Sequence, residues 1–160
     1  NYYDLAGYEN EVHFYKRGPQ NSRAFRALKV WMCLKQAGRE GLAKNIRKDI
    51  GLAKELYNQV LASEWLEPVS CSLSVVNFRY VPKGLEESNR NELLNSFNRR
   101  LLSVLQQTGE IYLTNSVING MYTLRACIVN FRTRKNDVLR LVEFVETTAK
   151  SLSETSDCKL

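Results

Sequence analysis

The chain has 160 residues, of which 44% are hydrophobic and 25% are charged. That length and balance are typical of a single soluble globular domain with a real core, and they exclude a disordered tail and a fibrous repeat. The formal net charge of +6 would allow a nucleic-acid partner, but the basic residues are spread along the chain. We therefore interpret them as a solvated surface and expect no nucleic acid among the partners.

The cysteines and the apolar runs limit where the protein could work. Four cysteines lie far apart without a C-x-x-C pair, and only one histidine is present to complete a zinc site. We therefore expect free thiols in a reducing compartment, which favours a cytoplasmic location. The longest uninterrupted apolar run, Val30–Leu34, is far shorter than the roughly 20 residues of a membrane span, so we expect no membrane partner.

The first 22 residues are predicted to form an extended arm. They contain aromatic and acidic side chains and the pair Gly18-Pro19, but no helical period. An extended arm needs another surface to lie on. We therefore place a boundary after residue 22 and treat residues 23–160 as the domain.

Two helices are predicted to follow the arm. Ser22 is a candidate N-cap for the first, which begins at Arg23 and ends near Gly38. Apolar side chains fill most of its circumference, a pattern typical of a helix that is packed on several sides. The second helix spans roughly residues 40–62, where apolar side chains recur at steps of three and four, although Gly51 inside it costs about 1 kcal/mol relative to alanine.

The next predicted elements are two strands and a third helix. The first strand lies around Trp65–Val69, and Pro68 marks it as an edge strand because proline cannot donate a ladder hydrogen bond. The second strand, Leu73–Val81, is rich in valine and aromatic residues. The third helix begins near Ser88 and ends at Gly109.

A β-hairpin is the clearest local signal in the sequence. Two apolar runs, Ile111–Ile118 and Met121–Asn130, flank the dipeptide Asn119-Gly120, which favours a two-residue turn because both residues tolerate positive φ. Apolar residues spaced over 138–149 predict a final helix. The order arm, helix, helix, ββα, ββα predicts an α+β fold, with helices on one face of a small, mainly antiparallel sheet.

The sequence contains few candidates for catalysis. Its one histidine, His13, lies in the predicted arm, and an exposed histidine without a role is the simpler interpretation. The eight glycines form neither a G-x-G-x-x-G motif nor a phosphate-binding loop, and no G-x-S-x-G motif is present. By itself, the chain therefore lacks a catalytic constellation.

Arg125 is the one charged residue in the second hairpin strand. Alternation along the strand puts Leu124, Ala126 and Ile128 on one face and Arg125 on the other. A guanidinium there must meet water, an acid or an anionic ligand, because an unpaired buried charge is very costly. Its planar fork suits a carboxylate or a phosphate, whereas an exposed sheet face or a structural salt bridge is the alternative interpretation.

Three segments together resemble a known family. Residues 14–31, FYKRGPQNSRAFRALKVW, resemble the segment after the cofactor domain in group II pyridoxal-phosphate-dependent amino-acid decarboxylases, the kin of aromatic-amino-acid and glutamate decarboxylases. Residues 109–113 and 124–133 resemble that family's C-terminal small domain, in the same order and at comparable spacing. The resemblance spans nearly the whole chain.

The resemblance implies a C-terminal fragment of a fold-type I enzyme, a carboxy-lyase that works as a homodimer on an amino-acid substrate. In that family a lysine directly after a histidine forms the Schiff base with pyridoxal phosphate, whereas His13 is followed by Phe14 here. The resemblance therefore implies that a preceding large domain binds the cofactor and that residues 1–22 lead from that domain. It also implies that the fragment is inactive alone.

The resemblance further assigns two positions. Arg125 matches a strand arginine that holds the substrate carboxylate in similar decarboxylases, and this favours a ligand contact over a salt bridge as its role. Tyr2 or Tyr3 is similar in position to the mobile-loop tyrosine that reprotonates the intermediate in these enzymes. We favour Tyr3, and an ordinary surface tyrosine is the alternative interpretation. The identity of the amino acid is not predicted, because selectivity for its side chain would depend largely on the preceding domain and the partner subunit.

A second class of function is compatible with the same element order. A ββαββα arrangement with positive charge also suits an RNA-binding or small-molecule regulatory module. The K/R-G-F/Y-G/A-F-V-x-F/Y pattern of one large group of RNA-binding domains is absent from the sequence. Salt-dependent binding to single-stranded RNA would separate this alternative from the decarboxylase.

Overall fold

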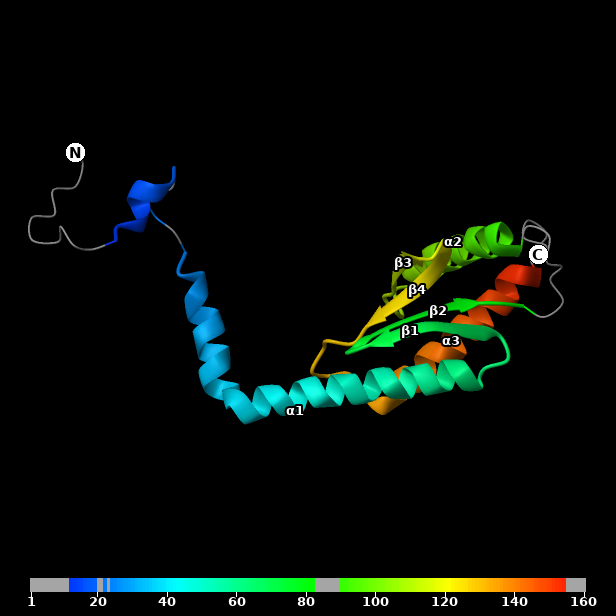
Figure 1. Cartoon of the computed structure of the whole chain (residues 1–160), viewed down its shortest axis with the longest axis horizontal. Coiled ribbons are helices and arrows are strands. Elements are labelled where there is room, and N and C mark those ends of the chain that lie inside the picture. Colours follow the sequence, from blue (N-terminus) through cyan, green and yellow to red (C-terminus); the bar gives the residue numbers. More distant parts are fainter. Residues whose placement is uncertain (1–11, 20–21, 23, 83–89, 155–160) are drawn as a thin grey trace, which may run out of the picture. The chain divides into compact units, whose positions relative to one another are not determined.

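A computed structural model of the chain describes residues 12–19, 22, 24–82 and 90–154 (Figure 1). The chain divides into two units, residues 1–39 and 40–160. The predicted boundary after residue 22 falls inside the first unit and stays a prediction. Residues 1–11 of the predicted arm lie outside the described residues, whereas one short 3₁₀ helix, η1 (Phe14–Arg17), lies within the arm.

The long helix α1 (Arg26–Ala62) joins the two predicted helices through a break at Gly38. Gly38 has φ of 65° and ψ of 175°, a backbone conformation that a residue without Cβ adopts at little cost. The predicted end of the first helix is therefore confirmed. Gly51 lies inside the regular part of α1, so the second predicted helix continues through it. None of the helices in the described ranges combines the length and the apolar character of a membrane span.

Four antiparallel strands form one sheet in the order β1-β2-β4-β3 (Figure 1). The strands are β1 (Leu66–Ser72), β2 (Val75–Tyr80), β3 (Thr114–Ile118) and β4 (Met121–Cys127). β1 is an edge strand, as Pro68 predicts, and its pairing with β2 is irregular between Pro68 and Ser70. The predicted α+β fold with a small antiparallel sheet is confirmed.

The core lies between this sheet and three helices: the part of α1 after Gly38, α2 (Arg90–Thr108) and α3 (Lys135–Glu154). Alternate residues of the two central strands enter the core, namely Val76, Phe78, Tyr80, Tyr122, Leu124 and Ala126. Because side chains alternate along a strand, the intervening residues lie on the opposite face. We call this the polar face, and its central residues are Asn77, Arg79, Thr123 and Arg125.

β3 and β4 form the predicted hairpin. Asn119 and Gly120 at its turn have φ of 50° and 78°, which matches the positive φ that the dipeptide predicts. Both strands are shorter than predicted. Leu113 and Ile128 are buried in the core although they lie outside the sheet, so an apolar run here extends beyond its strand.

Two asparagines of α2 bond the backbone of the sheet. Asn98 accepts a hydrogen bond from Tyr80 N–H (2.8 Å) and donates one to the Tyr80 carbonyl (2.9 Å). Asn95 accepts one from Tyr122 N–H (2.7 Å) and donates one to the Gly120 carbonyl (2.8 Å). Both contacts lie beyond the end of the β2–β4 ladder, so these side chains replace a strand partner there.

Candidate functional site

Arg125 lies on the polar face, in β4. The strand register puts it opposite Asn77 of β2 and Thr114 of β3. Its neighbours Leu124 and Ala126 are 0% and 3% exposed in the core, while Arg125 is half-buried. The predicted alternation along the strand is therefore confirmed, and the ligand-binding role of Arg125 stays a prediction.

A second arginine on the polar face, Arg79, forms the structural salt bridge that was an alternative for Arg125. Arg79 Nε lies 2.7 Å from Glu67 Oε2, and Arg79 Nη1 donates to Asn91 Oδ1 (2.9 Å). Within the described ranges, the guanidinium of Arg125 makes no hydrogen bond or ion pair. The polar face thus combines one arginine that is paired with an acid and one that has no acidic partner among the described residues.

Asn77 is a residue of the polar face that the sequence reasoning missed. It is 8% exposed, and its Nδ2 donates to Ser70 Oγ of β1 (2.9 Å). Its Oδ1 is buried without a hydrogen-bond partner. The signal in the sequence is an asparagine inside a run of valine and aromatic residues, because asparagine is depleted in strands.

The remaining candidates add no metal centre. The predicted site residue Tyr3 lies outside the described residues. His13 comes just before η1 and is half-buried, with its ring 5.5 Å from that of Tyr15. In the part of the chain that the structure describes, no three histidine, cysteine or acidic side chains gather to hold a metal ion.

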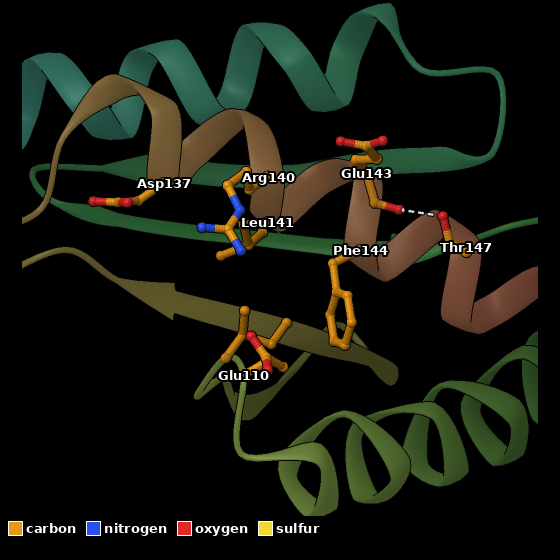
Figure 2. Close-up of a pocket in the computed structure, with 8 residues that line it drawn as sticks. Glu110, Asp137, Arg140, Leu141, Glu143, Phe144 and Thr147 are labelled. Atoms are coloured by element: carbon orange, nitrogen blue, oxygen red, sulfur yellow. Dashed lines mark hydrogen bonds between the residues drawn. The ribbon is translucent and has the colours of Figure 1, made fainter.

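A pocket of about 410 Å³ lies between α3 and the segment that follows α2 (Figure 2). Figure 2 shows Arg140 and Phe144 of α3 directed toward Glu110 across this pocket. The rest of the lining consists of Ile111, Asp137, Leu141, Glu143 and Thr147. Arg125 is not among the lining residues, so this pocket is separate from the candidate site on the polar face.

The pocket and the sheet do not fit pyridoxal phosphate, the cofactor that the resemblance implies. A Schiff base needs a lysine, yet no lysine lines the pocket and none lies in the four strands of the sheet. The carboxylates of Glu110, Asp137 and Glu143 at the pocket would repel a phosphate. Cofactor chemistry therefore cannot be derived from this part of the chain.

Several known proteins are similar to this chain in sequence and in fold. No protein-family model matches the chain. An aromatic-L-amino-acid decarboxylase of Bacillus atrophaeus is 28% identical over 151 residues, which are 94% of this chain and 31% of that protein. Tyrosine decarboxylase 1 of Narcissus pseudonarcissus is 37% identical over 107 residues, which are 65% of this chain and 21% of that protein.

A solved structure with the same fold is that of Catharanthus roseus tryptophan decarboxylase in complex with L-tryptophan. It superposes with a TM-score of 0.71 at 28% identity, over 88% of this chain and 29% of the decarboxylase chain. The chain thus spans less than a third of the length of these proteins.

The antiparallel sheet, its three helices and these similarities define an α+β domain of fold-type I pyridoxal-phosphate enzymes. Within that class, the chain is similar in sequence and fold to the group II amino-acid decarboxylases, and the similarity is consistent with a C-terminal domain. The predicted resemblance is therefore confirmed.

Proposed function

We propose that the chain is the C-terminal part of a pyridoxal-phosphate-dependent amino-acid decarboxylase, in which Arg125 binds the substrate carboxylate. The observation that carries this proposal is that Arg125 is half-buried and that its guanidinium has no ion-pair partner among the described residues. The relatives named aromatic-L-amino-acid, tyrosine and tryptophan decarboxylases support aromatic amino acids as the substrate class.

Arg125 is suited to orienting a carboxylate. The planar guanidinium can donate two parallel hydrogen bonds to the two oxygens, which fixes the direction of the bound group as well as its position. β4 pairs with a strand on each side, so the backbone that presents Arg125 is held rigidly. Fixing the carboxylate fixes the orientation of the bonds at the substrate Cα, and orientation of this kind lowers the barrier to reaction.

A preceding large domain and a second subunit complete the proposed enzyme. Helix α1 carries exposed apolar side chains before Gly38, with Val30, Trp31 and Met32 at 61%, 57% and 57% exposure. Several large apolar side chains exposed on one short stretch of helix are typical of an interaction site. We assign it to contact with the preceding domain, which would bind the cofactor, and we expect the chain to add to a homodimer surface. The chain alone would then be inactive.

The test uses the full-length protein that contains this chain, loaded with pyridoxal phosphate. Release of carbon dioxide from L-tyrosine, L-tryptophan and L-glutamate measures the activity and the substrate class. Arg125→Ala should raise KM by about tenfold or more, because it removes a hydrogen-bonded charge pair. Arg47→Ala, at an exposed position on α1, is the control. Unchanged KM and kcat in Arg125→Ala would show that the carboxylate contact is wrong.

Tyr3 is tested in the same assay as the proposed proton donor. Tyr3→Phe keeps the ring and removes the phenolic proton, so it should lower the rate of amine formation while KM changes little. Tyr2→Phe is the matched control because it removes a hydroxyl from the neighbouring residue. Equal effects of the two substitutions would reject the assignment to Tyr3.

A further inference from the structure

Asn77 has a buried hydrogen-bond acceptor that lacks a donor. The residue lies on the polar face and is 8% exposed. Its Nδ2 donates to Ser70 Oγ (2.9 Å), whereas its Oδ1 makes no hydrogen bond. Asparagine is unfavourable within a strand, and a buried unpaired acceptor costs further free energy. A donor that reaches Oδ1 would remove this second cost.

Arg125 is the donor best placed to reach Asn77. The β2–β4 register puts the two residues directly opposite each other, and opposite residues have Cβ atoms about 4.5–5.5 Å apart. Asn77 Nδ2 donates to Ser70 on β1, so Oδ1 is the amide atom left for a donor from β4, the strand on the other side of β2. Arg125 has several N–H donors and no acceptor within the described ranges. An unpaired acceptor therefore lies beside unpaired donors.

We propose that Asn77 is a positioning residue for Arg125, and this proposal rests on the carboxylate-binding function proposed above. When the carboxylate binds, Arg125 Nε–H donates to Asn77 Oδ1, while Nη1 and Nη2 each donate to one carboxylate oxygen. The bond to Asn77 fixes the direction of the guanidinium plane and leaves its terminal pair for the ligand. The hydrogen bond to Ser70 keeps the amide in the orientation that this arrangement needs.

Arg79 shows the effect of a charged acceptor on the same face. Its Nε donates to Glu67 at 2.7 Å, and only 10% of the Arg79 side chain is exposed. A carboxylate beside Arg125 would hold the guanidinium equally well, but it would compete with the carboxylate of the ligand. The neutral amide of Asn77 can position the guanidinium without neutralising its charge. This difference explains why an amide, and not an acid, suits position 77.

Two substitutions separate positioning from folding. The full-length protein with pyridoxal phosphate is assayed for KM and kcat by carbon dioxide release, and its Tm is measured. Asn77→Asp introduces the competing carboxylate, and it should raise KM by about tenfold or more without lowering Tm. Asn77→Leu removes the unpaired acceptor, and it should raise KM severalfold with Tm unchanged or higher. A purely structural asparagine would give the reverse, with a lower Tm and an unchanged KM.

Asn115→Leu, at an exposed position on β3, is the matched control and should keep the wild-type KM. A double-mutant cycle with Arg125→Lys tests the link to the guanidinium. Lysine has a methylene group where arginine has Nε–H, so Arg125→Lys already removes the proposed bond to Asn77. Adding Asn77→Leu to Arg125→Lys should therefore cause no further rise in KM. A full additional rise would reject the proposed pairing.

The outcomes distinguish this inference from the function on which it rests. If Asn77→Asp and Asn77→Leu both keep the wild-type KM, the positioning role is wrong. In that case a raised KM in Arg125→Ala preserves the carboxylate contact, whereas an unchanged KM in Arg125→Ala rejects both proposals. If Asn77→Leu does not fold, Asn77→Asp and Asn77→Ser test the positioning role instead, and a wild-type KM in both would reject it.

Discussion

The side chain of Asn98 forms hydrogen bonds with both backbone groups of Tyr80. Its Oδ1 accepts from the Tyr80 N–H (2.8 Å), and its Nδ2 donates to the Tyr80 carbonyl (2.9 Å). Asn98 is 0% exposed and Tyr80 is 1% exposed, so water cannot replace these bonds. Asn98→Leu should therefore lower the free energy of unfolding by about 2–4 kcal/mol, because two buried backbone groups lose their partner. Urea unfolding of the chain, followed by circular dichroism, measures the change.

Ser96→Ala on the exposed side of the same helix controls for helix propensity. Alanine is the better helix former, so this variant should be as stable as the wild type or slightly more so. A loss below about 0.5 kcal/mol in Asn98→Leu would mean that the backbone of Tyr80 finds other partners.

Features of the fold that depend on local chemistry are predictable from this sequence. The Asn119-Gly120 turn follows from the positive φ of its two residues, and the break at Gly38 follows from the same property. The face on which Arg125 lies follows from alternation along one strand. Each of these conclusions uses only neighbouring residues.

Features that need a partner far along the chain are not predictable in the same way. The bond from Asn98 to Tyr80 crosses 18 residues, and on the sequence alone Asn98 is one polar residue of an amphipathic helix. The sequence does not predict that Asn77 has an unpaired acceptor opposite Arg125, because this depends on the register between β2 and β4. Strand order and register therefore decide the candidate site, and neither follows from periodicity.

The ion pair between Arg79 and Glu67 should contribute to stability. Arg79 is largely buried while the Glu67 side chain is 45% exposed, so solvent screens part of the attraction. Glu67→Gln should lower the free energy of unfolding by about 1 kcal/mol, since Arg79 keeps its bond to Asn91 and a neutral acceptor remains. Urea midpoints at low and high salt measure the loss.

The pair between Lys135 and Glu55 is the matched control for Glu67. It has a similar distance, 3.0 Å, but the lysine side chain is 64% exposed. Glu55→Gln should therefore have a smaller effect than Glu67→Gln, and one that disappears sooner as salt is added. Equal losses in the two variants would contradict a special role for burial at Arg79.

Alkaline pH should unfold the chain partly through Tyr80. Burial raises the pKa of Tyr80, and the charge of Glu146 raises it further. The phenol ionises near pH 10 in an unfolded chain but only at higher pH in the folded one. Its contribution to stability is therefore fully present below about pH 10 and is lost as pH rises through the folded pKa.

Tyr80→Phe removes this ionisation and should make the alkaline fall in stability shallower than in the wild type. Urea midpoints between about pH 9 and pH 11 measure the slope. Burial also raises the pKa of Tyr122, so Tyr122→Phe should act in the same direction. If the slope in Tyr80→Phe equals that of the wild type, the alkaline transition arises elsewhere in the chain.

Replacing Leu73, in the turn between β1 and β2, with glycine should stabilise the folded chain. Its φ is 51°, and its side chain is 73% exposed. A leucine at positive φ is strained by about 1–2 kcal/mol, whereas glycine adopts that φ freely at an entropic cost of about 0.5–1 kcal/mol. Little packing is lost with an exposed side chain, so Leu73→Gly should raise the free energy of unfolding by about 0.5–1 kcal/mol.

The opposite change at the other hairpin turn is the matched control. Gly120 has φ of 78°, and a Cβ there would meet nothing closer than Asn91 Nδ2 at 4.0 Å. Crowding is therefore absent, and Gly120→Ala should destabilise the chain by about 1 kcal/mol through backbone strain alone. Thermal unfolding of both variants should move Tm in opposite directions. A lower Tm in Leu73→Gly would show that the exposed leucine stabilises the folded chain by more than its backbone costs.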